Sequence, residues 1–256
     1  MKSKEDLTLK AALYDATHRG HEGDLAFYQS QCPENSDLLE LGCGSGRILS
    51  ALSPRKGRTV GLDIDASLLS IARELLPDDV EFFLGNMLSF RSEDRFDRIL
   101  LPFNGIYCLG GMKYLDNLFQ TVSHHLREDG IFLVDLYDVA ELEADAMTIS
   151  ESVVEDEEDY ILDIQIDREI FQVFESTRWY PKQRRFEVTF RYESMSPLRL
   201  PIEMVVEHTY FPVGRLLDSA RKKGFEVLEH YEGFPESEDE DECPHVLLFR
   251  KAKLQL

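Results

Sequence analysis

The 256-residue sequence predicts an α/β fold: a seven-stranded, mostly parallel sheet with helices on both faces, plus an inserted antiparallel β block. Two observations predict it. Between residues 37 and 136, short apolar runs alternate with segments of helical period, the pattern of strand–helix–strand units. Residues 160–210 then hold strand-type runs with no helix between them, which is typical of antiparallel pairing. A last helix and two strands complete the sheet.

The first half of the chain supplies the parallel strands. Residues 4–31 predict two short helices around the glycines at 20 and 23. The expected strands then cover residues 37–41, 58–62, 80–84, 96–101 and 131–136, and the expected helices cover 47–52, 66–76 and 112–127. Pro54, Pro77 and Gly130 are the stop signals of these helices. Ligands of such sheets lie beyond the carboxyl ends of the strands.

The second half supplies the antiparallel block and the closing elements. Strands are expected over 160–166, 170–179, 185–192 and 202–209, then a helix over 212–223 ended by Gly224, and strands over 225–231 and 246–250. Polar and apolar residues alternate through 185–192, so one side of that strand should face solvent. We interpret the chain as one domain with a helical lid at 1–31, a ligand-binding core at 37–137, an insertion at 150–210 serving as lid or dimer surface, and a closing part at 211–256.

Charge and cysteine content exclude several classes of protein. There are 28 basic and 49 acidic residues, a net charge of −21, so nucleic acid and anionic membranes are unfavourable partners. Two acidic runs, 151–159 and 236–242, are expected to be solvated loops. The four cysteines form no CxxC pair, which predicts reduced thiols in a cytoplasmic protein and no metal site. No stretch has the length and apolarity of a signal peptide core or a membrane span.

The most informative segment joins the first strand to its helix. Residues 38–47 read LeuLeuGluLeuGlyCysGlySerGlyArg, so Glu40 lies in the strand and glycines follow at 42, 44 and 46. Glycine allows a tight turn and the close approach of a ligand, and a helix N-terminus favours an anionic group. Asp63 ends the second strand, where a carboxylate binds the ribose of a nucleotide-like ligand. A dinucleotide fingerprint would need its third glycine at Arg47, which disfavours a nucleotide-linked oxidoreductase.

Residues 40–46, GluLeuGlyCysGlySerGly, resemble the E-x-G-x-G-x-G signature of class I S-adenosylmethionine-dependent methyltransferases, which have a Rossmann-like fold. GlyLeuAspIleAsp at 61–65 and PheLeuGlyAsnMet at 83–87 resemble further motifs of that family. The resemblance implies that Asp63 binds the ribose, that Ile64 packs on the adenine, and that Met87 offers it a backbone N–H. Asn86 stands where Asp is usual, and it either accepts from the adenine amino group or serves the turn. The implied cofactor-binding set is Glu40, Gly42, Cys43, Gly44, Gly46, Asp63, Ile64, Asn86, Met87 and Leu101.

Methyl transfer is an in-line displacement that depends chiefly on positioning, and a base is needed only if the nucleophile must lose a proton. Tyr14, Asp135 and His208 are the candidate catalytic residues, although packing or turn roles are as compatible with their positions. The candidate acceptor-binding residues are Asn104, Tyr107, Tyr137 and Tyr210. Tyr14 and the inserted block resemble sugar-amine and glycine N-methyltransferases.

We therefore expect transfer of a methyl group from S-adenosylmethionine to a small-molecule amine or hydroxyl, with the insertion as the candidate surface of a homodimer. The alternatives are a protein that binds the cofactor without transferring methyl, and a protein methyltransferase that acts on a basic partner.

Overall fold

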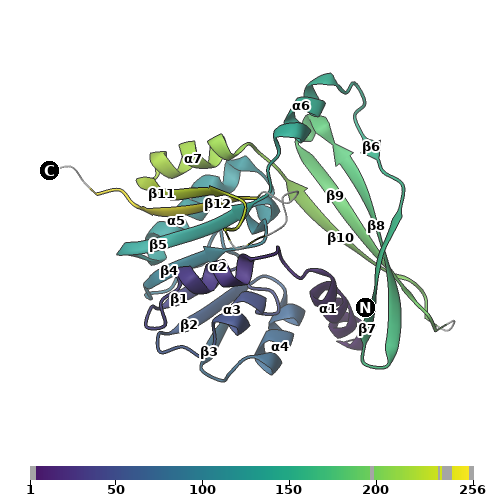
Figure 1. Ribbon diagram of the computed structural model, residues 1–256, viewed down its shortest axis with the longest axis horizontal. Helices are drawn as coiled ribbons and strands as arrows, with labels where there is room; N and C mark the ends of the chain where they lie inside the picture. Colours follow the sequence, from purple (N-terminus) through teal and green to yellow (C-terminus); the bar gives the residue numbers. More distant parts are fainter. Residues whose placement is uncertain (1–3, 197–198, 236, 238–243, 254–256) are drawn as a thin grey trace. The chain divides into compact units, whose positions relative to one another are not determined.

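The computed structural model describes residues 4–196, 199–235, 237 and 244–253 (Figure 1). The chain forms two compact units rather than one. Unit 1 comprises Met1–Arg19 and Val139–Tyr210, and unit 2 comprises Gly20–Asp138 and Phe211–Leu256. Each unit therefore combines segments that are distant in the sequence.

Unit 2 contains the expected seven-stranded sheet, in the order β11-β12-β5-β4-β1-β2-β3. Its strands are β1 (Leu38–Leu41), β2 (Thr59–Asp63), β3 (Val80–Leu84), β4 (Phe96–Leu101), β5 (Leu126–Leu136), β11 (Phe225–Glu232) and β12 (His245–Lys251). The first five are parallel, while β12 pairs antiparallel with both β5 and β11. The carboxyl ends of β1, β2 and β4 consequently meet at one edge of the sheet.

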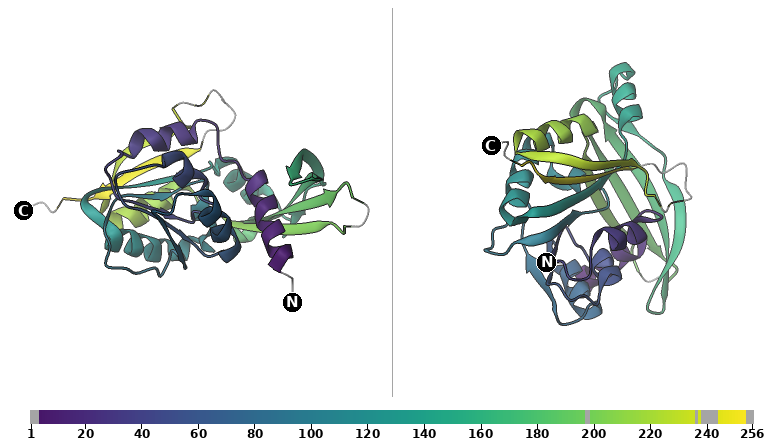
Figure 2. Two further views of the ribbon diagram at one scale, coloured as in Figure 1. Left: turned by 90° about the horizontal axis from the view of Figure 1, so that it is seen from below. Right: turned by 60° about the vertical axis from the view of Figure 1, so that its left-hand side comes forward.

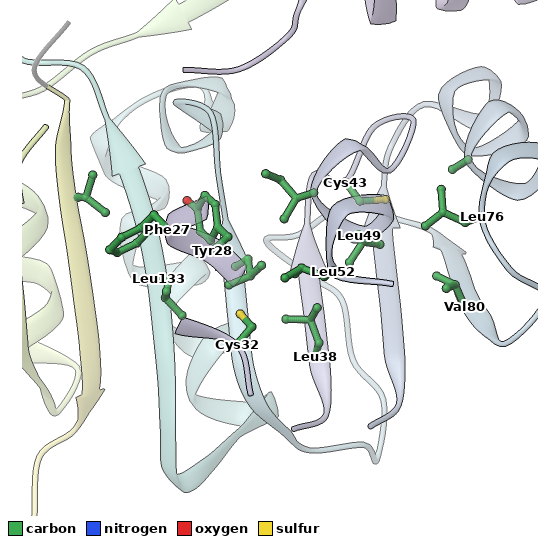
Figure 3. Close-up of a cluster of buried hydrophobic side chains, with 14 of the residues drawn as sticks. Phe27, Tyr28, Cys32, Leu38, Cys43, Leu49, Leu52, Leu76, Val80 and Leu133 are labelled. Atoms are coloured by element: carbon green, nitrogen blue, oxygen red, sulfur yellow. The ribbon is translucent and has the colours of Figure 1, made fainter. Parts of the chain in front are cut away.

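Helices cover both faces of this sheet. On one face, α2 (Asp24–Gln31), α3 (Arg47–Leu52) and α4 (Ala66–Leu75) bury a cluster that includes Phe27, Leu49 and Leu133 (Figure 3). On the other, α5 (Leu115–His125) places Phe119 against Phe132 of β5, and α7 (Val213–Lys222) lies beside α5. Successive strand residues point to opposite faces, so Phe132 packs into the core on one side of the sheet and Leu133 into the core on the other.

The junction of α5 and β5 differs from the prediction. The expected helix over 112–127 begins as a 3-10 turn, Met112–Tyr114, and α5 ends at His125. Strand β5 starts at once, because Leu126 already pairs with Phe96. Gly130, expected to stop the helix, lies inside the strand, where a Cβ would come within 2.8 Å of the Leu126 side chain. The glycine therefore allows this segment to bend closely back on itself.

Unit 1 is built on a five-stranded antiparallel sheet, in the order β10-β9-β8-β6 with β7 also paired to β8. Its elements are α1 (Lys4–Thr17), α6 (Ala140–Thr148), β6 (Val154–Glu155), β7 (Asp159–Ile166), β8 (Glu169–Tyr180), β9 (Arg185–Ser194) and β10 (Ile202–Thr209). Helix α1 packs against one face of this sheet, with Leu13 among Phe171, Val173 and Tyr192 (Figures 1 and 2). All four strands predicted here are present, whereas α6 and β6 were not predicted.

Two expectations about chain segments need revision. Helices α1 and α2 both form, but they belong to different units, so residues 1–31 do not make one lid. The acidic run at 151–159 is largely exposed, yet it contains β6 and the first residue of β7. The run at 236–242 lies, apart from residue 237, outside the described residues. Among the helices that the structure describes, none has the length and apolar character needed to cross a membrane.

Candidate active site

The glycine turn at the carboxyl end of β1 is built as the sequence predicts. Gly42, Gly44 and Gly46 have φ of 71°, 56° and 85°, in the left-handed region that favours glycine. The amides of Gly42 and Cys43 both donate to the carbonyl of Leu62, at 2.7 and 3.0 Å, which fixes the turn against β2. A Cβ on Gly46 would lie 2.9 Å from Leu76, whereas a Cβ on Gly44 would meet no atom within 4 Å. Gly44 therefore borders open space that a ligand can occupy.

Asp63 links this turn to the end of β2. Its Oδ2 accepts from the amide of Gly44 and its Oδ1 from the amide of Asp65, both at 2.8 Å. Burial raises the pKa of Asp63, although these amide donors favour its ionised form. Asp65 caps α4 by accepting from the amides of Ser67 and Leu68. Each oxygen of Asp63 keeps a second lone pair, so the carboxylate can still accept from a diol.

Glu40 is buried in β1 with one polar atom unused. Glu40 is only 2% exposed, and its Oε2 has no hydrogen-bond partner among the described residues. Burial raises the pKa of Glu40, while the positive charge of Arg47 opposes that rise. A buried oxygen without a donor beside an open glycine turn fits a ligand that carries a hydrogen-bond donor or a positive charge.

The residues expected around the adenine are also near the turn. Ile64 is 72% exposed and follows Asp63 directly. The methyl group of Met87 lies 3.5 Å from the point where a Cβ on Gly42 would stand, so it borders the turn. Asn86 already serves a turn, because its Oδ1 accepts from the amide of Leu88 at 2.8 Å. Cys43 and Leu101 are both buried in the core behind the site.

A buried polar network holds the carboxyl ends of β4 and β5. Asp135 is 1% exposed and accepts from the Tyr28 hydroxyl at 2.6 Å, the Phe103 amide at 2.8 Å and the Asn104 amide at 3.0 Å. Phe103 and Asn104 have φ of 51° and 58°, a conformation that costs a non-glycine residue about 1–2 kcal/mol. Two successive amides thus converge on one carboxylate, which offsets that strain. Asp135 was a candidate catalytic residue, but this environment does not suit proton transfer from an acceptor, since both oxygens are engaged and the group is buried.

The acceptor residues predicted in unit 2 lie together around this network. The Asn104 Oδ1 accepts from the Tyr137 amide at 2.6 Å. The Tyr107 hydroxyl donates toward the carbonyls of Tyr137 and Phe211, at 3.1 and 3.3 Å, and its ring lies 4.6 Å from that of Tyr137. The polar atoms of Asn104 and Tyr107 are thus occupied in shaping the chain, and the Asn104 amide nitrogen also lies 3.2 Å from Nε2 of His21.

Sequence reasoning missed an ion pair beside this network. Asp24, 2% exposed, accepts from both terminal nitrogens of Arg47, at 3.0 and 2.5 Å. Gly20 has φ of 85°, and a Cβ there would lie 2.3 Å from the Arg47 guanidinium carbon, so a side chain would be strained and would displace Arg47 from Asp24. No motif spacing relates Asp24 to Arg47. In the sequence, Arg47 is notable only because it occupies the position where a dinucleotide fingerprint has its third glycine.

The remaining predicted residues belong to unit 1. Tyr14 stacks on His18 with 3.8 Å between ring centroids, and Phe186 lies 5.2 Å from the ring of His208. Burial lowers the pKa of His208 to about 4, so it is neutral at neutral pH and a weak base. The Tyr210 hydroxyl accepts from the indole nitrogen of Trp179 at 2.9 Å.

Comparison with known proteins finds relatives among methyltransferases. Residues 38–130 match the family model described as a methyltransferase domain. A dTDP-3-amino-3,6-dideoxy-α-D-glucopyranose N,N-dimethyltransferase of Streptomyces fradiae is 32% identical over 49% of this chain and 52% of its own length. A dTDP-3-amino-3,4,6-trideoxy-α-D-glucopyranose N,N-dimethyltransferase of Streptomyces venezuelae is 28% identical over 57% and 65% respectively. The chain thus spans about half to two thirds of the length of these curated relatives.

The fold is likewise shared with solved structures. An amino pentose methyltransferase from Micromonospora echinaspora, solved with S-adenosylmethionine bound, superposes with a TM-score of 0.69 at 19% identity, over 93% of this chain and 97% of that one. The chain therefore has the fold of the class I S-adenosylmethionine-dependent methyltransferases, and its residues 38–130 match the model of a methyltransferase domain.

Proposed function

We propose that this protein transfers a methyl group from S-adenosylmethionine to the nitrogen of a small-molecule amine. One observation carries the cofactor assignment: open space at Gly44, whose amide donates to Asp63, at the end of the strand that holds the buried, unpartnered oxygen of Glu40. These features suit the two ends of one ligand, a cationic amino-acid part and a ribose diol. When bound, the cofactor supplies an electrophilic methyl group on a sulfonium. Transfer of this methyl group breaks its bond to sulfur, and the sulfur leaves as a neutral thioether.

The roles of the chain's own residues follow from their positions. Asp63 accepts hydrogen bonds from the ribose while it stays bound to Gly44, so the turn and the ribose are oriented by one carboxylate. Glu40 accepts a hydrogen bond through Oε2, an interaction favoured by its low-dielectric surroundings. Ile64 and Met87 cover the faces of the adenine, and Asn86 shapes the turn that presents Met87.

The amine assignment rests on chemistry and on the relatives. A neutral amine attacks without a base, whereas a hydroxyl must lose a proton, so weak or enclosed bases at the two candidate positions Asp135 and His208 favour an amine. Asp135 is enclosed and His208 is a weak base, which leaves positioning as the main task of the protein. Both relatives named above are N,N-dimethyltransferases. Tyr137 remains the proposed acceptor contact within unit 2, and the roles of Tyr14 and Tyr210 in unit 1 stay predictions from the sequence.

Calorimetric titration with S-adenosylhomocysteine tests the cofactor assignment. Asp63→Ala should weaken binding by about 1.5–3 kcal/mol, the usual worth of hydrogen bonds to a charged group. Asp79→Ala, which changes an exposed carboxylate in the same unit, is the matched control and should bind normally. Absence of binding by the folded wild-type protein would refute the proposal.

Transfer of labelled methyl then separates the function from its alternatives. A small amine should become labelled while its hydroxyl analogue does not. Tight cofactor binding without labelling of any amine would favour a binding protein, and labelling confined to a protein partner would favour a protein methyltransferase.

A further inference from the structure

His21 lies just before α2, beside the acceptor residues predicted in unit 2. Its ring packs against Phe103 and Phe234, with 5.1 and 5.9 Å between ring centroids. Its Nε2 lies 3.2 Å from the side-chain nitrogen of Asn104. All four residues belong to unit 2, so these contacts are internal to one compact unit. No motif in the sequence pointed to this histidine.

The orientation of the Asn104 side-chain amide is fixed by a backbone donor. The N–H of Tyr137 can only donate, and it lies 2.6 Å from the Asn104 side chain, so the atom that faces it is the carbonyl oxygen Oδ1. The exchanged orientation would oppose two N–H donors at that distance. Asn104 therefore turns its NH2 group toward His21.

The orientation of this amide determines the tautomer of His21. The NH2 group of Asn104 has donors only, so Nε2 of His21 must accept the hydrogen bond. An imidazole nitrogen accepts only when it carries no proton, which makes the ring neutral with its one proton on Nδ1. His21 is therefore an acceptor for Asn104, and its Nε2 is not available to take a proton from a bound amine.

His21 is also connected to the glycine turn. Its backbone N–H donates to Oδ2 of Asp24 at 3.2 Å, and Asp24 in turn binds both terminal nitrogens of Arg47. Arg47 begins α3 directly after Gly46. A continuous series of polar contacts consequently runs from the glycine turn through Asp24 and His21 to Asn104.

Asn104 depends on His21 for a partner to its NH2 group. Asn104 is only 7% exposed, and His21 is the one partner that the described residues give this group. A buried donor without an acceptor is unfavourable, so loss of the imidazole would turn the amide toward other partners. That rotation would release the backbone N–H of Tyr137, the proposed acceptor contact.

We propose that His21 is a positioning residue for methyl transfer: as the neutral Nδ1–H tautomer it holds the Asn104 side chain and, through it, the Tyr137 backbone in a fixed place relative to the glycine turn. The proposal rests on the methyltransferase function proposed above and adds a residue to it. In-line displacement requires the acceptor to be aligned with the methyl group, so a shift of Tyr137 slows transfer without loosening the cofactor.

Two variants separate positioning from packing. His21→Gln keeps an acceptor near the place of Nε2 but loses the ring, whereas His21→Phe keeps the ring and loses the acceptor. Transfer of labelled methyl to phenethylamine and to dTDP-3-amino-3,6-dideoxy-α-D-glucopyranose is measured. His21→Phe should lower kcat roughly three- to tenfold, as expected for one lost hydrogen bond, and His21→Gln should stay within about twofold of the wild type. His230→Phe, which changes an exposed histidine of the same unit, is the control and should leave kcat unchanged. A His21→Gln variant slower than His21→Phe, or a His21→Phe variant at the wild-type rate, overturns the proposal.

Nuclear magnetic resonance of protein with isotope-labelled histidine tests the contact without catalysis. The ring signals of His21, assigned by their loss in His21→Gln, should show the Nδ1–H tautomer in mildly alkaline buffer, and an Nε2–H tautomer overturns the proposal. The amide signal of Tyr137 should shift in His21→Phe and stay in place in His21→Gln. Binding of S-adenosylhomocysteine with no transfer to either amine by the wild type would count against the proposed function. The tautomer and the Tyr137 signal would still decide whether His21 holds Asn104.

Discussion

The hydroxyl of Tyr28 is the simplest way to perturb the network behind the site. Tyr28→Phe removes one atom from a fully buried ring and leaves the Asp135 carboxylate with its two amide donors. A hydrogen bond to a charged acceptor contributes about 1.5–3 kcal/mol, and one to a neutral acceptor about 1 kcal/mol. The free energy of unfolding should therefore fall by about 1.5–3 kcal/mol while Asp135 is ionised.

The loss should depend on pH. Burial raises the pKa of Asp135 above its unfolded value of 3.8. The free energy of unfolding therefore declines as the pH rises from 3.8 through the folded pKa, because the native state must then hold a buried charge. The Tyr28 hydroxyl favours the ionised carboxylate and limits that decline. The variant should accordingly lose more stability near pH 8 than near pH 4.

Urea unfolding of the variant and the wild-type protein at these two pH values measures both effects. Tyr231→Phe is the control, because its hydroxyl donates to the exposed side chain of Glu229 in the same unit. A Tyr28→Phe variant as stable as the control at both pH values would refute the role given to this hydrogen bond.

Three further changes test other parts of the structure. Gly44→Val should abolish binding of S-adenosylhomocysteine and lower the free energy of unfolding by only about 1–2 kcal/mol. Gly57→Ala, whose Cβ would lie 2.1 Å from a backbone oxygen, should lower the free energy of unfolding by more than about 2 kcal/mol and leave the affinity of the folded protein unchanged. Calorimetry measures the affinity and thermal unfolding measures the stability of each variant. Asp24→Asn should cost about 3 kcal/mol in urea unfolding because it removes the negative charge paired directly with Arg47, and a loss below about 1 kcal/mol would contradict this. As the pH falls from 6.5 to 4, the neutral, buried His208 should cost the wild-type protein about 3 kcal/mol in free energy of unfolding. His208→Phe should remove this acid-dependent loss. The same pH profile of stability in the variant and the wild-type protein would count against this reasoning.

The sequence predicted the elements whose signal is local. The glycines at 42, 44 and 46 have the backbone conformations that their spacing implied, and the alternation in 185–192 correctly indicated a strand with one apolar face. Helix α6 and strand β6 escaped prediction because α6 buries no residue and β6 has only two residues, which leaves neither periodicity nor length to detect.

The site was predictable only where a motif marks it. Glu40 and Asp63 were found because they flank the glycine turn in sequence order. The role of Asp135 was not, because its partners Tyr28 and Phe103 are 107 and 32 residues away and none of the three belongs to a motif. Likewise, the assignment of α1 and α2 to different units depends on which face each helix buries, which a hydrophobic pattern alone does not specify.

The pairing of α1 with the unit 1 sheet has a consequence for synthesis of the chain. Leu13 belongs to a cluster whose members outside α1 begin at Leu162, so the helix emerges from the ribosome well before any strand that it covers. Its partners are complete only after β10, when the parallel strands of unit 2 have already been made. A truncated protein that begins at Gly20 would retain every strand of that antiparallel sheet and expose its apolar surface, so we expect it to aggregate although its glycine turn is untouched.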